Sequence, residues 1–144
     1  MRFAILIDGM EPAPQGSKTL TRYGTMIETC RRVGVWRALV EKEAKAVCKT
    51  MLTGPCRVSA EFRFRRPLGD YTSTGEIKAK APIFYTKRKN DIDKITRSTL
   101  DALTGVAFKD DCQVVSLQAE RRYVREGERP GAFVIVEQIW SDAP

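Results

Sequence analysis

The chain has 144 residues, of which 42% are hydrophobic and 30% are charged, so it fits one soluble globular domain with a core of its own. It carries a net charge of +7, four cysteines without a C-x-x-C pair, and no histidine. These features argue against a Cys/His zinc site and exclude catalytic triads that need histidine. Catalysis would have to use carboxylates, amines, guanidinium groups or a metal ion. The apolar stretch at residues 3–7 is too short for a signal peptide or a membrane span, so we expect a cytoplasmic protein.

Hydrophobic periodicity predicts the element order β-α-β-loop-α-β-β within a single domain that covers residues 1–144. This order indicates an α+β fold, in which two main helices pack on one face of a small mixed β-sheet. The predicted strands are residues 2–8, 57–65, 112–124 and 132–140, and the predicted helices are residues 35–52 and 91–103.

Two of these segments also predict which side chains are buried. The first helix has apolar residues at helical spacing, namely Trp36, Leu39, Val40, Ala44, Val47 and Met51. The strand at residues 57–65 alternates, which places Val58, Ala60, Phe62 and Phe64 inward and Ser59, Glu61, Arg63 and Arg65 outward. The outward arginines are either simply solvated or in contact with DNA.

The connections have composition typical of turns. Residues 67–82 are polar and rich in turn formers, which predicts a mobile loop, and together with the basic residues that follow they form a basic loop at about 67–90. The sequence REGERPG at residues 125–131 predicts a hairpin that joins the last two strands.

Most of the positive charge lies in one part of the chain. Residues 63–90 contain eight Lys or Arg and only two acids, which is nearly the whole excess. Such a run is often only a solvated loop, but next to an acidic cluster it suggests a surface for a phosphate backbone. The candidate nucleic-acid contacts are Lys18, Arg63, Arg65, Lys87, Arg88, Lys89 and Lys94.

The acidic cluster follows at once, in residues 89–111. It contains Asp91, Asp93, Asp101, Asp110 and Asp111. The second helix has Asp91 or Asn90 as its N-cap and Gly105 past its end. Asp93, Arg97 and Asp101 share a stripe that is separate from the predicted core side, which is Ile92, Ile95, Thr99, Ala102, Leu103 and Val106. A helix of about 12 residues spans about 18 Å, so the fold must bring the loop acids toward Asp91 and Asp93.

Two interpretations of these acids remain open. Mg²⁺ binds one or two carboxylates together with waters and phosphate oxygens, so Asp91, Asp93, Asp110 and Asp111 are candidate metal ligands for phosphodiester cleavage, with Arg97 and Lys94 as cationic partners. In the ordinary alternative, Asp91 caps the helix, Asp110 and Asp111 are turn residues, and the stripe on the helix is a ladder of surface ion pairs.

The spaced pattern D-I-D-K-I-x-R, then L-D-A-L-T-G-V, then K-D-D-x-Q-V-V resembles the RusA family of Holliday junction resolvases of bacteria and their phages. The resemblance extends to P-Q-G-S-K at residues 14–18 and to Trp36-Arg37, and it is strongest over residues 90–115. It implies a homodimeric endonuclease that depends on Mg²⁺, with Mn²⁺ as an alternative, and nicks four-way DNA junctions symmetrically. By the motif, Asp91, Asp93 and Asp111 match the catalytic, metal-binding acids, with Asp110 adjoining.

The chain departs from the family pattern D-x-D-N-L-x-K at two positions. Lys94 replaces the Asn, and Arg97 replaces the catalytic Lys. An Arg can grip phosphate with two N–H groups but does not donate a proton as a tuned Lys does. Two alternatives to a junction resolvase therefore stay open: a branched-DNA-binding protein whose site no longer cuts, and a nuclease for flaps or forks.

Overall fold

A computed structural model describes residues 1–16, 18–20, 22–23, 26–28 and 31–139. Two long helices and six strands make up its regular structure, together with two short 3-10 turns at Leu68–Asp70 and Asp111–Gln113. The strands are β1 (Arg2–Asp8), β2 (Lys18–Leu20), β3 (Met26–Glu28), β4 (Cys56–Phe64), β5 (Val114–Tyr123) and β6 (Gly131–Gln138), and the helices are α1 (Val33–Val47) and α2 (Ile92–Leu103).

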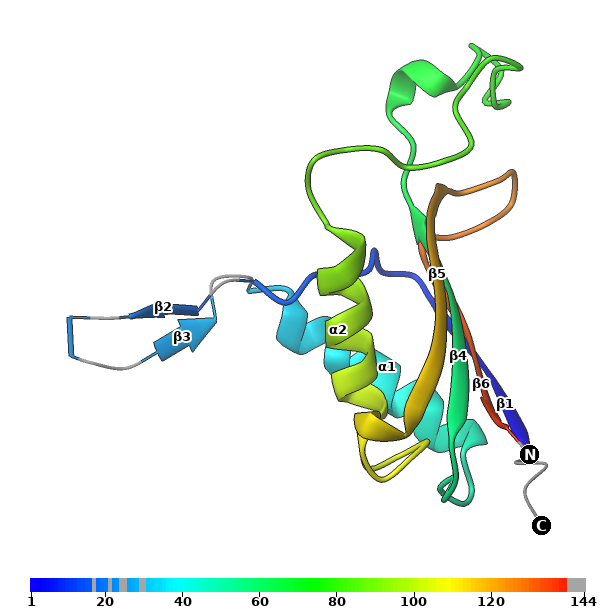
Figure 1. Cartoon of the computed structure of the whole chain (residues 1–144). Coiled ribbons are helices and arrows are strands. Elements are labelled where there is room, and N and C mark those ends of the chain that lie inside the picture. The colour runs from blue at the N-terminus through cyan, green and yellow to red at the C-terminus, as the bar shows by residue number, and fades with distance from the viewer. Residues whose placement is uncertain (17, 21, 24–25, 29–30, 140–144) are drawn as a thin grey trace.

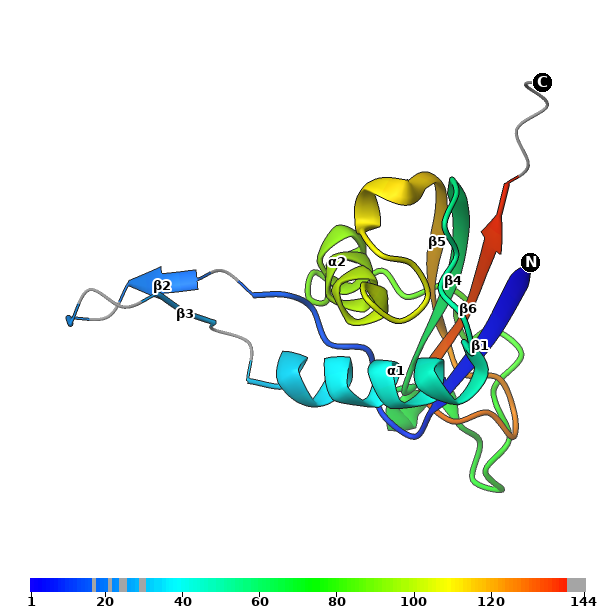
Figure 2. The ribbon, with the colours of Figure 1, turned by 90° about the horizontal axis from the view of Figure 1, so that it is seen from below.

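The main sheet has four strands in the order β1-β6-β4-β5. β4 pairs with β5 in parallel and with β6 antiparallel, so the sheet is mixed. Both helices lie on the same side of this sheet, and no helix of the described residues covers the other face (Figures 1 and 2). The structure confirms the predicted α+β class, the mixed sheet and the single helical layer.

The predicted hairpin at residues 125–131 is wrong. β5 and β6 are consecutive in the chain, but β4 lies between them in the sheet. Residues 125–131 therefore cross over the end of β4, and β6 runs back between β4 and β1. The error has a simple cause: Gly and Pro at 127, 130 and 131 mark a turn but do not decide which strands pair on either side of it.

Gly131 shows why this crossing needs a glycine. Its φ is 154°, and a Cβ added there would lie 1.9 Å from the carbonyl oxygen of Ile7 on β1. Only glycine lets β6 begin this close to β1, where Asp8 pairs with Gly131.

The core lies between the sheet and the two helices. Val58, Ala60, Phe62 and Phe64 of β4 are buried as predicted. α1 begins and ends earlier than the apolar pattern predicted. Val47 is its last residue and Met51 lies past its end, and these residues are 42% and 46% exposed instead of packed. Buried Trp36 joins the helices, because its indole N–H donates to the Thr99 hydroxyl over 3.1 Å.

α2 matches the prediction more closely. Asp91 is its N-cap, and Gly105 follows its end with a φ of 83°. Its buried side includes Thr96 and Ser98, whereas Ile92 is 37% exposed. The Ser98 hydroxyl donates to the carbonyl of Ala13 over 2.7 Å, which ties the segment after β1 across this helix.

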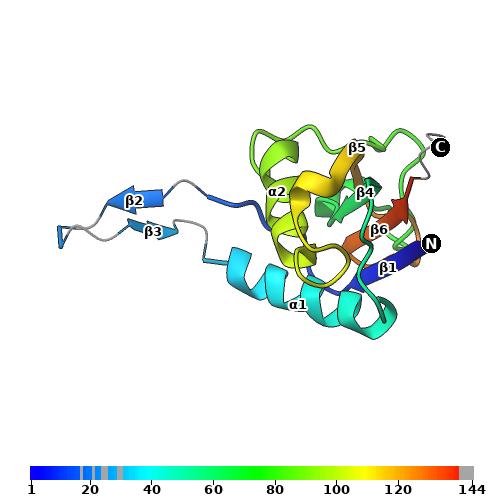
Figure 3. The same ribbon diagram turned by 60° about the horizontal axis from the view of Figure 1, so that its bottom comes forward.

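A two-stranded hairpin formed by β2 and β3 extends away from the helices and the main sheet (Figure 3). The sequence analysis assigned no element here. Lys18 begins β2, but its side chain lies outside the described part of the structure, as does Trp140 at the predicted end of the last strand. Among the helices of the described residues, none is long and apolar enough to cross a membrane.

Candidate active site

Asp91 occupies the N-cap of α2 without acting as a side-chain cap. Its backbone is extended, with φ −52° and ψ 138°, and its carbonyl accepts the N–H groups of Lys94 and Ile95 at 3.0 Å. Its carboxylate makes no capping hydrogen bond and is 51% exposed. The side chain of Asp91 therefore does not cap the helix. Both of its carboxylate oxygens remain able to bind a ligand.

The other charged residues of α2 follow on its exposed side. Asp93 in the first turn is exposed and makes no ion pair with any residue that the structure describes. The Lys94 ammonium lies 3.7 Å from Asp91. Arg97 is 64% exposed and lies 3.7 Å from Asp101, whose carboxylate also accepts from Arg37 of α1 at 3.4 Å. Of the expected ladder of ion pairs, only the pair between Arg97 and Asp101 forms. Asp93 has no ion-pair partner among the described residues.

The residue before Asp91 fixes the direction in which the chain enters the helix. Asn90 has a φ of 57°, in the left-handed region that Asn tolerates better than most residues, and it is only 6% exposed. Its amide donates to the Tyr85 hydroxyl at 3.0 Å and accepts from Arg32 at 3.4 Å. The backbone at the mouth of α2 is therefore held by side chains on both sides.

Arg121 on β5 holds the same segment. One terminal nitrogen of its guanidinium lies 3.4, 3.3 and 3.1 Å from the carbonyl oxygens of Lys87, Lys89 and Asn90. The guanidinium also lies over the Tyr85 ring, 5.3 Å from its centre. We call residues 85–90 the basic strap. The backbone carbonyl groups of Lys87, Lys89 and Asn90 in this strap point toward Arg121.

The second acidic pair lies at the opposite end of α2, in the turn that starts β5. Asp110 accepts the backbone N–H of Cys112 at 3.0 Å, and this bond, with the neighbouring Asp111 side chain, holds the pKa of Asp110 below its usual range. Gln113 accepts the N–H groups of Lys109 and Asp110 and donates to two carbonyls at residues 52 and 54. The carboxylate of Asp110 thus stabilises the turn. Asp111, the next residue, is half-buried.

Two hollows between α2 and β5 show how these groups are distributed. One, of about 330 Å³, is lined by Asp93 and Arg97 together with apolar side chains of α2 and β5. The next, also about 330 Å³, is lined by Arg97, Leu100 and Asp111. Arg97 belongs to both. Within the described ranges, no three acidic or cysteine side chains gather closely enough to hold a metal ion, so one chain does not unite Asp111 with Asp91 and Asp93.

The predicted DNA-contacting cations fall into two groups. Arg63 is 4% exposed and donates to Asp8 and to the carbonyls of Ile7 and Arg129, so it is not the solvent-facing arginine that the strand alternation predicted. The others differ: Arg65 at the end of β4 and the strap residues Lys87, Arg88 and Lys89 are exposed. No ion pair joins these four to any described residue.

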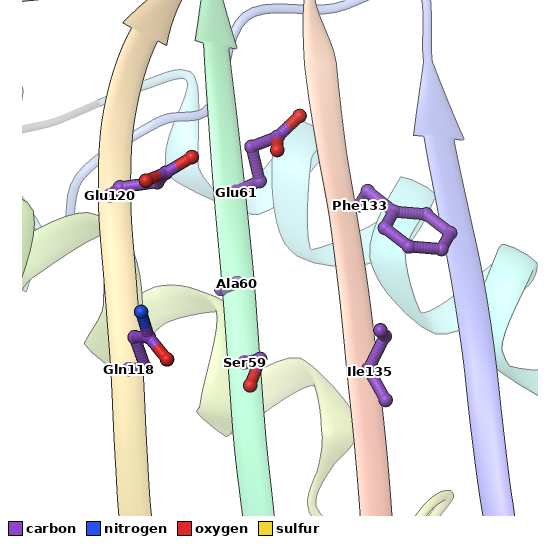
Figure 4. Close-up of a pocket in the computed structure, with 7 residues that line it drawn as sticks. All are labelled: Ser59, Ala60, Glu61, Gln118, Glu120, Phe133 and Ile135. Carbon is purple, nitrogen blue, oxygen red and sulfur yellow. The ribbon is translucent and has the colours of Figure 1, made fainter. Parts of the chain in front are cut away.

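The uncovered face of the sheet has a different chemistry. A hollow there is lined by Ser59, Glu61, Gln118, Glu120, Phe133 and Ile135 (Figure 4). Glu61 and Glu120 lie side by side on β4 and β5, next to the apolar side chains of β6 (Figure 4). Two carboxylates and two apolar side chains do not suit a polyanion, so the helical side is the better candidate for DNA.

The sequence did not predict three residues that position the site, namely Tyr85, Arg121 and Gln113. Each acts on the backbone of a segment far from it in sequence, and a single sequence shows no sign of such a contact. Asn90 offered one usable signal, because Asn directly before a helix N-cap is a residue that accepts positive φ.

Comparison with known proteins identifies the family of the chain. The sequence model of the family described as "Endodeoxyribonuclease RusA" matches residues 9–137. A Bacillus subtilis (strain 168) protein, "Uncharacterized protein YqaN", is 30% identical over 94 residues, which span 63% of this chain and 63% of that protein. The family match takes in both helices, β4, β5 and all but the last residue of β6, with every acid at the ends of α2, whereas β1 lies before it. The chain belongs to the RusA endodeoxyribonuclease family.

Proposed function

We propose that the chain is a metal-dependent endonuclease that cuts four-way DNA junctions. The observation that carries the proposal is the carboxylate of Asp93, which has no ion-pair partner among the described residues. It lies two residues from Asp91, whose carboxylate does not cap the helix, and one helical turn from Arg97. In the first turn of α2 this acid gains only the interaction with the helix dipole, which is about 0.3–1 kcal/mol at an exposed position. It is well placed to bind a cation that itself binds a phosphate.

The donor set at this helix end fits a hard divalent cation. Asp91 and Asp93 offer only oxygen atoms, and the chain has no histidine that would favour a softer metal. These two acids would hold Mg²⁺, or Mn²⁺ in its place. When bound, the cation supplies an activated water and neutralises charge on the scissile phosphate. Asp111 enters the proposal as the third acid, on the other side of Arg97.

Arg97 contributes through its charge and its N–H groups. Its guanidinium is 64% exposed in the hollow that Asp93 also lines, where it can donate to a phosphate oxygen. Such a donor stabilises the charge that builds in the transition state. Arg97 remains protonated throughout, so it orients and stabilises the phosphate and transfers no proton.

A second copy of the chain is part of the proposal, because a two-fold junction needs two cuts related by symmetry. β5 is the edge strand of the sheet, and its Val115 and Leu117 side chains are 64% and 50% exposed. An edge strand presents unpaired backbone N–H and C=O groups, and exposed apolar side chains on it give a second chain a surface to cover. Light scattering should give the mass of a dimer, and Leu117→Glu should shift it toward a monomer.

One observation favours a second candidate, a junction-binding protein that does not cut. Lys94 stands where the family pattern has Asn, and its ammonium lies 3.7 Å from Asp91, where it competes with a metal ion. The two candidates bind the same DNA and differ only in cleavage.

The test is a cutting assay with labelled four-way junction, flap and linear duplex, in Mg²⁺ and in EDTA. The proposal predicts paired nicks in the junction with Mg²⁺ and none in EDTA. Junction binding without nicks in Mg²⁺ or Mn²⁺ would select the second candidate. Preferential cutting of the flap would replace the junction as the substrate.

A further inference from the structure

A cavity of about 290 Å³ lies beside the basic strap, between the end of β4 and the strap itself. Four cationic side chains line it: Arg65 and Arg66 at the end of β4, and Lys87 and Lys89 on the strap. Glu11 is the one acid among the lining residues. The excess of positive charge makes the cavity a candidate site for an anion.

The four cations do not have the same role. The Arg66 side chain is 4% exposed and is held in place, because its Nε donates to the carbonyl of Val124 at 2.8 Å and its Nη1 donates to the carbonyl of Pro82 at 2.7 Å and to Asp70 at 3.2 Å. Arg66 therefore builds the wall of the cavity.

Arg65, Lys87 and Lys89 are exposed and have no hydrogen bond or ion pair from their side chains to any described residue. Glu11 likewise forms no ion pair within the described residues, so it neutralises at most one of them. Three cations converge on one cavity with their donors unused. A bound anion is the partner that this arrangement lacks.

The cavity is built on rigid parts of the fold. Its Tyr85 wall stacks on Phe64 with ring centres 4.1 Å apart, and Tyr123 lies 5.3 Å from Tyr85. Backbone bonds join Tyr85 to Arg121 at 3.2 Å and Tyr123 to Ile83 at 2.9 Å. Since Arg121 also holds the carbonyls of Lys87 and Lys89, the backbone that carries both lysines is fixed before any ligand arrives.

We propose that this cavity binds one phosphate of the DNA strand that is cut, at a fixed distance from the acids of α2. The inference rests on the proposed function and adds to it a discrete phosphate site. Lys89 precedes Asp91 by two residues, and the intervening Asn90 is buried and bonded on both sides, so the two sites are held in register. Arg65 would bind the phosphate through its planar fork, and the lysines as point charges.

The experiment neutralises one phosphate at a time. Four-way junctions that carry a single methylphosphonate near the expected cut are titrated with the protein in EDTA, so that binding is measured without cleavage. In the wild type, one position should weaken binding by about tenfold, because the charge-assisted hydrogen bonds to that phosphate are lost. Its neighbours should have much smaller effects.

The matched variants separate this site from general attraction. Lys87→Ala/Lys89→Ala removes two lysines that line the cavity, whereas Lys78→Ala/Lys80→Ala removes two exposed lysines with the same spacing in the same basic stretch. Both should weaken binding to every junction and flatten its salt dependence. Only the first should abolish the position-specific effect of the methylphosphonate. Thermal melting confirms that each variant is folded.

Three results would overturn the inference. The wild type shows no sensitive position, or the sensitive position survives in Lys87→Ala/Lys89→Ala, or it disappears equally in Lys78→Ala/Lys80→Ala. Competition by millimolar inorganic phosphate at constant ionic strength, without a sensitive position in the DNA, would assign the cavity to free phosphate instead. Because binding is read in EDTA, the outcome does not depend on whether the junction is ever cut.

Discussion

Two regions of this protein use charged side chains in opposite ways. Around Arg122 each charged side chain has a partner of opposite charge: the Arg122 guanidinium is 3% exposed and lies 2.6 Å from both Glu61 and Glu128. Along the basic strap and the exposed side of α2, Lys87, Lys89 and Asp93 have no such partner among the described residues. The first region stabilises the fold. The second carries unbalanced charge of both signs, cations beside acids, as a site for a metal ion and a phosphate requires.

The comparison shows that the count of charges in a segment does not identify a binding surface. Arg63, Arg65 and Arg66 lie within four residues of each other. The side chains of Arg63 and Arg66 are 5% and 4% exposed and hydrogen-bonded, whereas Arg65 is exposed and has no hydrogen bond or ion pair to any described residue. What distinguishes them is the number of unused donors. The distinction can be tested by variants that change one region and leave the other intact.

The largest effect on rate among the cations is expected at Arg97. Arg97→Ala should slow single-turnover junction cleavage by about 10²–10³-fold, because a well-placed electrostatic donor is lost. Arg97→Lys should retain substantial activity if charge is what matters. Faster cutting by Arg97→Lys than by the wild type would mean that proton donation matters instead, and full activity in Arg97→Ala would leave Arg97 only its exposed pair with Asp101.

The largest effect on stability is expected at Arg122. Arg122→Ala leaves the carboxylates of Glu61 and Glu128 without their shared partner and should cost about 3 kcal/mol of unfolding free energy. Urea denaturation measures this. Junction binding by the folded fraction should not change, and a loss of affinity as large as that of Lys87→Ala/Lys89→Ala would break the division between the two regions.

Arg121 lies at the boundary between them, and its effect should be intermediate. Arg121→Ala releases three carbonyls of the basic strap and should lower kcat/KM about tenfold, with a loss of only about 1 kcal/mol in stability. Arg121→Lys should recover part of the activity. A proportionate loss of stability and activity, with the pH profile of kcat unchanged and no recovery in Arg121→Lys, would make Arg121 a purely structural residue.

The smallest expected effect is a pH dependence at Glu128. Its hydrogen bond to Arg122 lowers the pKa of Glu128 to about 2, from 4.5. A carboxyl with a depressed pKa stabilises the fold above its unfolded pKa and loses that contribution as the pH falls from about 4.5 toward 2. The stability difference between wild type and Glu128→Gln should therefore shrink over this interval, which urea denaturation at a series of pH values measures.

The sequence predicted the fold well where a pattern is local. The strand at residues 2–8 and the helix that follows Asp91 were placed within one residue, because alternation, helical spacing and a capping position are all properties of neighbouring residues. The order of the strands was not local. The position of β4 between β5 and β6 depends on which strands pair along the sheet. The sequence of the turn does not determine that pairing.

The site divides in the same way. Asp91, Asp93 and Arg97 share one end of one helix, so their spacing alone placed them together. Asp111 depends on how the turn before β5 is held, by Gln113 bonding to residues 52 and 54, and its separation from Asp93 is a tertiary result. Buried Arg63 was misplaced for a related reason: alternation predicts the face of a strand, but not whether another segment covers that face.

The central claim is that the carboxylate of Asp93, which has no ion-pair partner among the described residues, serves catalysis. Single-turnover cleavage of one four-way junction in Mg²⁺ by wild type, Asp93→Asn and Glu120→Gln tests it directly, since both variants remove one exposed carboxylate from opposite sides of the molecule. Asp93→Asn should abolish cutting while junction binding in EDTA persists or tightens, and Glu120→Gln should cut like the wild type. Normal cutting by Asp93→Asn would contradict the account.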